Sequence, residues 1–206
     1  MTPTRRPERE AHQLAAGPPP RAGGTPLLAP PPDGLAEATF GGGCFWCTES
    51  DMQRIDGVDI AISGYTGGAE ISPTYREVAG GATGHVEAVR VFHDPAQVTY
   101  EQLLAVYWRH IDPTDDQGQF ADRGAHYRPV IYVHDEEQRR LATASRDAVA
   151  ASGRFDRPIV VAIEDAGDFW IAEEEHQNFY LERPAHYERY RRGSGRTRFI
   201  ERTWGR

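Results

Sequence analysis

The sequence predicts one domain of the α+β class. Segments with the two-residue alternation of a strand and segments with the apolar stripe of a helix are interspersed, without the strict alternation of a parallel α/β fold. No internal repeat interrupts this order. Residues 34–206 are numerous enough to bury one sizeable core without disulfides or metals. We therefore expect a single α+β domain over residues 34–206.

The composition excludes several classes of function. With a formal charge of −8, the chain lacks the basic face that nucleic-acid binding needs. All 23 basic residues are arginines, which excludes Schiff-base chemistry, pyridoxal phosphate attachment and the lysine of a P-loop. No segment approaches the roughly 18 consecutive apolar residues of a membrane span. We expect a monomeric, cytoplasmic protein that binds neither nucleic acid nor membrane.

Residues 1–33 are predicted to be a disordered tail. They hold nine of the 15 prolines and four arginines, and they contain too little apolar surface to offset the entropy of ordering. The run Leu27-Leu28-Ala29 is far shorter than the apolar core of about 7–15 residues in a signal peptide. An extension without a role and a targeting arm are the two interpretations of this tail.

The first element of the domain is a strand, residues 35–40, followed by a turn that holds both cysteines and by a helix, residues 48–55. The turn is Gly41-Gly42-Gly43-Cys44-Phe45-Trp46-Cys47. Its three glycines allow a sharp bend, because glycine adopts positive φ without strain. A thiolate at the start of a helix is stabilised by the free N–H groups and by the helix dipole. We therefore expect a lowered pKa for Cys44, the candidate nucleophile.

The next elements are two strands and a helix. Residues 58–63 predict a short strand, which glycines end. The clearest strand is 86–92, where alternation puts Glu87 on the same face as Val89 and Val91. A helix over 99–110 follows, with a threonine as its N-cap and an apolar stripe.

The second half of the chain begins with a polar loop, residues 112–128. Loops longer than about 12–15 residues are usually functional or disordered, and the aromatic and charged residues of this one favour function. Strands over 129–133 and 159–163 and helices over 136–152 and 172–181 complete the prediction. The acidic run 173–175 before His176 suits the start of a helix better than a metal site. An arginine-rich end contains the motif Tyr190-Arg191-Arg192-Gly193-Ser194-Gly195-Arg196.

Seven segments occur in an order that is highly specific. They are Gly43-Cys44-Phe45-Trp46, Gly64-Tyr65-Thr66-Gly67-Gly68, Pro73-Thr74-Tyr75-Arg76-Glu77-Val78, Thr83-Gly84-His85-Val86-Glu87-Ala88-Val89, Asp122-Arg123-Gly124, Tyr127-Arg128 and Glu175-His176-Gln177. Together they resemble the A-type peptide methionine sulfoxide reductases. The resemblance implies a two-layer α/β sandwich with a ferredoxin-like core and a mixed sheet. It also implies reduction of the S-epimer of methionine sulfoxide, free or in proteins, with no metal and no organic cofactor.

The chemistry of that reaction requires a nucleophile and an acid, because a sulfoxide sulfur is a poor electrophile until its oxygen is protonated. Cys44 is the predicted nucleophile. Glu87 is the predicted acid, since desolvation on an apolar strand face would raise its pKa and keep it protonated near neutrality. Attack would yield methionine and a Cys44 sulfenic acid. The alternative for Glu87 is an ordinary strand glutamate paired with an arginine.

The resemblance assigns the substrate contacts to further residues. It implies that Tyr75, Tyr127 and Asp122 hold the sulfoxide oxygen or a catalytic water, and that Phe45 and Trp46 form an aromatic slot for the ε-methyl group. The alternative for Asp122 is a turn residue that bonds its own backbone. The alternative for Tyr75 and Tyr127 is packing of their loops against the domain, and the alternative for Phe45 and Trp46 is a structural role in the core.

Recycling depends on Cys47, because the C-terminal region has no cysteine and Ser194 stands where some relatives of this family have one. Helical spacing puts the Cα atoms of Cys44 and Cys47 about 5–5.5 Å apart, within the range of a disulfide. We expect this disulfide to form and to be reduced by a thioredoxin-type dithiol. A passive helix residue is the alternative for Cys47.

Two other classes of protein use cysteines in this way. A zinc module would combine Cys44 and Cys47 with His85 and His126, although a second closely spaced ligand pair is missing. A thioredoxin-like dithiol oxidoreductase also has C-x-x-C after a strand, but its chemistry does not need Glu87.

Overall fold

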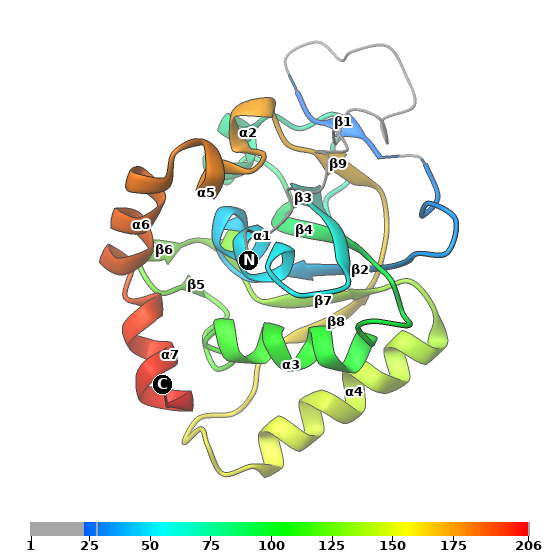
Figure 1. Ribbon diagram of the computed structural model, residues 1–206. Helices are drawn as coiled ribbons and strands as arrows, with labels where there is room; N and C mark the ends of the chain where they lie inside the picture. Colours follow the sequence, from blue (N-terminus) through cyan, green and yellow to red (C-terminus); the bar gives the residue numbers. More distant parts are fainter. Residues whose placement is uncertain (1–22, 28, 206) are drawn as a thin grey trace, which may run out of the picture.

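The computed structural model describes residues 23–27 and 29–205, which form a mixed sheet packed against helices (Figure 1). Within these residues the main sheet has seven strands in the order β1-β9-β3-β4-β2-β7-β8. Neighbouring strands run antiparallel, except for the parallel pair β7 and β8. The predicted α+β class with a mixed sheet is confirmed.

The elements follow one another along the chain with these bounds: β1 Thr25–Pro26, β2 Ala36–Gly41, α1 Phe45–Gln53, β3 Val58–Thr66, α2 Tyr75–Ala79, β4 Val86–His93, α3 Tyr100–His110, β5 Gly118–Gln119, β6 Asp122–Arg123, η2 Ala125–Tyr127, β7 Val130–Val133, α4 Glu136–Ala151, β8 Ala162–Asp165, β9 Phe169–Ile171, η3 Glu174–His176, α5 Phe179–Glu182, α6 Pro184–Gly193 and α7 Arg196–Trp204.

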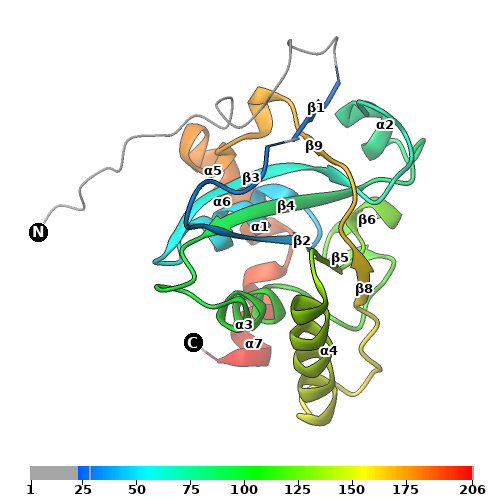
Figure 2. The ribbon, with the colours of Figure 1, turned by 90° about the vertical axis from the view of Figure 1, so that its right-hand side faces the viewer.

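Helices α3 and α4 lie on one face of the sheet, and α1 packs on strands β3 and β4 (Figure 2). The main core lies between these helices and the sheet. Strand β4 is buried along its whole length, with Val89 and Val91 in the main core. Ala88 and Phe92 belong to a second cluster. The predicted alternation of this strand is confirmed, and it sets the direction of the Glu87 side chain.

The segment that the sequence predicts as a tail contains a short strand. In β1, Thr25 and Pro26 pair with Ile171 and Trp170 of β9. Leu27 is 5% exposed and packs in the second cluster. Residues 23–27 therefore lie against the domain, and the prediction for residues 1–22 falls outside the described residues.

The predicted helix over residues 172–181 is wrong. Strand β9 ends at Ile171, a single 3-10 turn spans Glu174–His176, and a short helix begins only at Phe179. Asn178 adopts a φ of 51°, which breaks the helical path. Its backbone N–H donates to the buried Glu49 carboxylate at 2.8 Å. Tertiary hydrogen bonds therefore override the local helix preference of this acidic segment.

The polar loop 112–128 contains the small hairpin of β5 and β6 and the 3-10 turn Ala125–Tyr127. Helices α5, α6 and α7 form the C-terminal region, which runs along one side of the molecule (Figure 1). Across the described part of the chain, every helix is too short or too polar to cross a membrane.

Candidate active site

The two cysteines lie at the junction of β2 and α1. Strand β2 ends at Gly41, and Cys44 is the N-cap residue of α1. Gly43 has a φ of 82°, and a Cβ at this position would lie 2.6 Å from the Gln119 Cβ. Only glycine fits this turn without strain, so the predicted strand, turn and helix are present, with the helix starting at Phe45.

Glu87 points toward the cysteine turn. It pairs with Tyr65 in the sheet and is 1% exposed. Its Oε2 accepts a hydrogen bond from the backbone N–H of Phe45 at 3.0 Å. Burial raises the pKa of Glu87 to about 8, and the Phe45 N–H opposes this shift. The carboxyl group is therefore largely protonated at neutral pH and lies beside the residue that follows Cys44.

The expected lowering of the Cys44 pKa is wrong. Burial raises the pKa of this thiol well above its ordinary value, and the nearby Cys47 and Glu87 add to the increase. The helix-start amide of Phe45 is already bonded to Glu87, and Cys44 is 6% exposed. A sequence pattern places a thiol at a helix N-terminus, but it does not indicate which group accepts the hydrogen bond from the backbone N–H there.

Cys47 lies one turn further along α1 and is 0% exposed. Both thiols are free, and the Cys47 N–H donates to the Cys44 carbonyl at 3.1 Å. The pKa of Cys47 is lowered to about 7, first by a hydrogen bond from Cys44 and then by Arg196 and Arg191. Its surroundings are the apolar cluster with Phe179, Tyr180 and Tyr187.

An aromatic wall stands beside the thiols. Trp46 is half-buried, and its ring stacks on Phe179 with centroids 3.8 Å apart. Phe45 is 1% exposed, and its ring lies 6.4 Å from that of Tyr75. The Trp46 Nε1 donates to the His176 Nδ1 at 3.3 Å. Phe45 belongs to the core, while Trp46 faces partly outward.

Tyr75, Asp122 and Tyr127, the three further residues predicted by resemblance, are distant from Cys44 in sequence but lie near it in space. The Tyr75 and Tyr127 side chains lie near each other, and each affects the pKa of the other. Burial raises the pKa of both, and the nearby Glu87 adds to the increase. Asp122 interacts electrostatically with both tyrosines, and burial raises its pKa as well. The eight predicted site residues are Cys44, Phe45, Trp46, Cys47, Tyr75, Glu87, Asp122 and Tyr127, and the structure brings them together.

Tyr190 is a site residue that sequence reasoning missed. Its hydroxyl donates to the Asp122 carboxylate at 2.5 Å, and its side chain lies near enough to the Cys44 thiol to oppose the rise of the Cys44 pKa. Its ring meets Trp46 edge-on at 5.7 Å. The signal was the motif 190–196, which stands out in the sequence but carries no spacing that indicates a role.

The zinc alternative does not assemble in the structure. The His85 ring lies 3.3 Å from the Gly68 N–H and 2.8 Å from the Glu70 carbonyl. His126 packs on Tyr127 with ring centroids 4.1 Å apart. In the described residues, no three histidine, cysteine or acidic side chains are grouped so that they could hold a metal ion.

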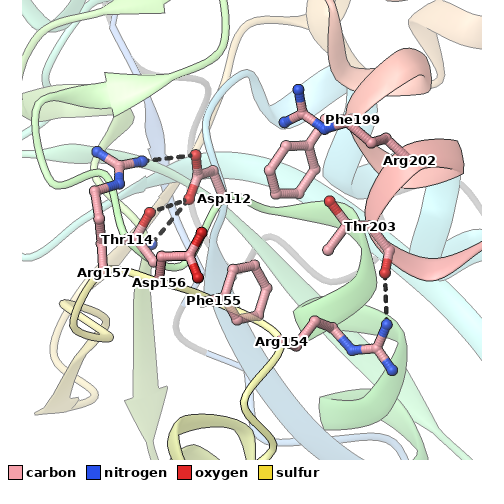
Figure 3. A pocket seen from close by; sticks show the side chains of 9 residues that line it. All are labelled: Asp112, Thr114, Arg154, Phe155, Asp156, Arg157, Phe199, Arg202 and Thr203. Atoms are coloured by element: carbon pink, nitrogen blue, oxygen red, sulfur yellow. Dashed lines mark hydrogen bonds and ion pairs between the residues drawn. The ribbon is translucent and has the colours of Figure 1, made fainter.

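A separate cavity of about 690 Å³ lies between the segment 112–114, the segment 154–157 and helix α7 (Figure 3). Asp112 accepts hydrogen bonds from Thr114 and, at 3.2 Å, from Arg157 at its edge. The lining contains none of the predicted site residues. This cavity is therefore separate from the thiol site.

Comparison with known proteins agrees with this site. Residues 36–206 match the family described as peptide methionine sulfoxide reductase. The peptide methionine sulfoxide reductase MsrA of Listeria innocua is 52% identical over 172 residues, which cover 84% of this chain and 97% of that protein. MsrA of Bacillus subtilis is 51% identical over 168 residues, covering 82% and 95%.

Solved structures show the same fold. Methionine sulfoxide reductase A of Corynebacterium diphtheriae superimposes with a TM-score of 0.66 at 28% identity, covering 86% of this chain and 92% of that one. Mxr1 from Saccharomyces cerevisiae in its reduced form gives a TM-score of 0.67 at 28% identity, covering 74% and 88%.

The fold and these matches define an oxidoreductase. The chain belongs to the peptide methionine sulfoxide reductase family, and its relatives are of the A type, as the sequence predicts. Its activity is the reduction of methionine sulfoxide, which serves protein repair. The zinc module and the thioredoxin-like oxidoreductase are thereby set aside.

Proposed function

We propose that this protein reduces the S-epimer of methionine sulfoxide, free or in proteins, with Cys44 as the nucleophile and Glu87 as the acid. The observation that carries the proposal is the hydrogen bond of 3.0 Å from the Phe45 N–H to the Glu87 carboxyl, which ties the acid to the residue next to the thiol. The raised pKa of Glu87, about 8, supplies the proton-donating form at neutral pH.

The electron and proton balance of this step is simple. Glu87 protonates the sulfoxide oxygen while the Cys44 sulfur attacks the sulfoxide sulfur, and the proton that the Cys44 thiol loses restores the Glu87 carboxyl group. The sulfur–oxygen bond of the substrate breaks, the hydroxyl group passes to Cys44, and methionine leaves. The products are methionine and a Cys44 sulfenic acid. The sulfoxide is reduced by two electrons, and the Cys44 sulfur is oxidised by two.

The residues around the thiol support substrate binding. Tyr75 and Tyr127, which lie near each other and near Glu87, would hold the sulfoxide oxygen with Asp122. Trp46, stacked on Phe179, presents an aromatic surface to the ε-methyl group, and Phe45 supports it from the core. These side chains orient the sulfoxide so that its oxygen faces the acid.

Recycling is proposed to use Cys47. It attacks the sulfenic acid, water leaves, and a Cys44–Cys47 disulfide forms. The helical position of Cys47, whose N–H donates to the Cys44 carbonyl at 3.1 Å, supports a bond with little unwinding. A thioredoxin-type dithiol would then reduce the disulfide. No metal or organic cofactor takes part in this cycle.

Turnover of the two resolved sulfoxide epimers with thioredoxin tests the proposal. Only the S-epimer should react, Cys44→Ser should abolish turnover, and Glu87→Gln should slow it by roughly 10²–10⁴-fold, the range for a lost general acid. Glu49→Gln is the matched control, because Glu49 is also fully buried but bonds Ser63 and Asn178. Equal losses in the two glutamine variants would contradict the role of Glu87.

A peptide map after one turnover tests the recycling step. Wild-type protein should contain a Cys44–Cys47 disulfide, and Cys47→Ser should retain the sulfenic acid for longer and recycle slowly with thioredoxin. A Cys47→Ser variant that recycles at the full rate would mean direct reduction of Cys44.

A further inference from the structure

The last residue of the motif 190–196 is a buried arginine beside the cysteine turn. Arg196 is the first residue of α7 and is 1% exposed. Its Nη2 donates to the Gly42 carbonyl at 2.9 Å, and its Nη1 donates to the carbonyl of His110 at the end of α3. A Cβ at Gly43 would lie 2.9 Å from Nη2. The guanidinium is therefore packed directly against the turn that ends in Cys44.

Within the described part of the chain, the Arg196 guanidinium has no carboxylate in direct contact. Its charge opposes the rise that burial causes in the pKa of Asp122 in strand β6, and it lies over the Phe120 ring, 4.7 Å from the ring centroid. Among the described residues, no carboxylate oxygen lies within 4.0 Å of its guanidinium, and its buried Nε has no hydrogen-bond partner. Carbonyl groups supply only partial negative charge. The buried Arg90, in contrast, faces the Glu37 carboxylate at 3.7 Å. A buried cation that only carbonyl groups and an aromatic ring contact directly favours the formation of an anion close to it.

Of the two arginines that act on Cys47, only Arg191 has a carboxylate within ion-pair distance in the described residues. The Arg191 guanidinium is paired with Asp51 at 2.8 Å and also donates to the Tyr187 hydroxyl. The groups that face Cys47 are Cys44 in the turn, Asp51 on α1, Glu87 on β4, Tyr187, Tyr190 and Arg191 on α6, and Arg196 on α7.

We propose that Arg196 is a positioning residue for recycling, whose charge holds Cys47 as a thiolate beside Cys44. The inference rests on the proposed disulfide step. Cys47 gives up its proton, its sulfur forms a bond with the Cys44 sulfur, and the sulfur–oxygen bond of the sulfenic acid breaks. The hydroxide takes up one proton and leaves as water. The Cys47 sulfur is oxidised, and the sulfenic sulfur is reduced.

The same charge acts again when the disulfide is reduced. Cys44 is 6% exposed and Cys47 is 0% exposed, so an external dithiol meets the Cys44 sulfur first. Cys47 is then the leaving group, and a stabilised thiolate leaves faster. The pKa of Cys47, lowered to about 7 by the hydrogen bond from Cys44 and then by Arg196 and Arg191, agrees with both steps.

A thiolate titration tests the proposal. In a Cys44→Ser background, the ultraviolet absorbance of the Cys47 thiolate is followed against pH, with Cys44→Ser/Cys47→Ser as the blank. Adding Arg196→Gln should raise the midpoint by about one pH unit or more, whereas Arg196→Lys should keep it near the parent value. Arg90→Gln, the loss of another buried arginine, is the matched control. A midpoint that Arg196→Gln leaves unchanged in a folded protein overturns the proposal.

A second measurement needs no arginine variant. The Cys47 midpoint of the folded Cys44→Ser protein should lie below the midpoint of the same protein in urea, and a folded midpoint at or above the unfolded one overturns the proposal. Neither titration uses substrate, so both are independent of the disulfide. Failure to find the disulfide after turnover of the wild-type protein would overturn the recycling route and leave the pairing of Arg196 with Cys47 intact.

Discussion

The hydroxyl of Tyr190 donates to the Asp122 carboxylate at 2.5 Å, which joins helix α6 to the hairpin of β5 and β6 beside Cys44. Burial raises the pKa of Asp122, and this hydrogen bond opposes the increase. Residues from the C-terminal region therefore control the charge of a carboxyl group that belongs to the polar loop.

Tyr190→Phe should lower kcat/KM by about tenfold or more, because a hydrogen bond to a charged group contributes roughly 1.5–3 kcal/mol. Without it, Asp122 should titrate at higher pH, so the limb of the kcat/KM profile that reports this group should move upward. Steady-state kinetics against pH measures both effects. Tyr100→Phe is the control, since the Tyr100 hydroxyl is buried without a partner in the described residues. A Tyr190→Phe profile that coincides with that of the control would contradict the role of this bond.

Glu49 predicts how stability changes with pH. Burial raises its folded-state pKa to about 8 from 4.5, so between these values the folded protein binds more protons than the unfolded chain. The contribution of this group to the free energy of unfolding therefore falls as pH rises through that window, by up to about 1.4 kcal/mol per pH unit, and is constant above it. Glu87 acts in the same direction.

Glu49→Gln should flatten this dependence. Denaturant unfolding at pH 5 and pH 8 should show a loss of stability in the wild-type protein that is smaller by about 1–3 kcal/mol in the variant. Glu174→Gln, at an exposed carboxylate, is the control. If stability falls by the same amount between pH 5 and pH 8 in the wild type and in Glu49→Gln, the pH dependence does not come from Glu49.

Gly43→Ala tests the cysteine turn. The position combines a φ of 82° with a Cβ that would lie 2.6 Å from the Gln119 Cβ. The matched control is Gly81→Ala, which has a φ of 70° and nothing within 4 Å of the added Cβ. Both should lose about 1 kcal/mol from backbone strain, and Gly43→Ala should lose a further 1–3 kcal/mol and most of its activity from the clash. Equal unfolding free energies for the two variants would show that the clash relaxes without cost.

Much of the site could be predicted from the sequence because its signals are local. The glycine turn determines where Cys44 lies, and two-residue alternation determines that Glu87 shares the buried face of Val89. Tyr190 and Arg196 could not be assigned, since the polar helices that carry them have no local pattern that indicates what they cover. The Gly42 carbonyl and the guanidinium that binds it are 154 residues apart.

The failures share a physical cause. Free N–H groups at a helix start were expected to lower the pKa of Cys44, but Glu87, from a distant strand, accepts one of them. The segment 172–181 has helical propensity, yet Gln177 bonds the Ser63 and Ala172 backbone and Asn178 takes a positive φ. In both cases a partner that is remote in sequence decides which hydrogen bond forms, and propensity does not describe such partners.

Glu173 belongs to the acidic run 173–175, in which the sequence does not distinguish its specific structural role. Its carboxylate accepts hydrogen bonds from the Tyr65 hydroxyl at 2.7 Å and from the Tyr75 backbone N–H at 2.8 Å. It therefore fixes the start of α2, where Tyr75 enters the site. Glu173→Ala should destabilise the fold by about 2–4 kcal/mol, because it leaves two donors without an acceptor.

The same change should raise KM more than it lowers kcat, since Tyr75 would lose its fixed position while Cys44 and Glu87 keep theirs. The adjacent Glu174→Ala removes an exposed carboxylate from the same acidic run and is the matched control. Unfolding curves and steady-state kinetics on the free sulfoxide separate the two effects. If Glu173→Ala and Glu174→Ala behave alike in both measurements, the orientation of Tyr75 does not depend on Glu173, and the start of α2 must be held by its capping box at Thr74 and Glu77 alone.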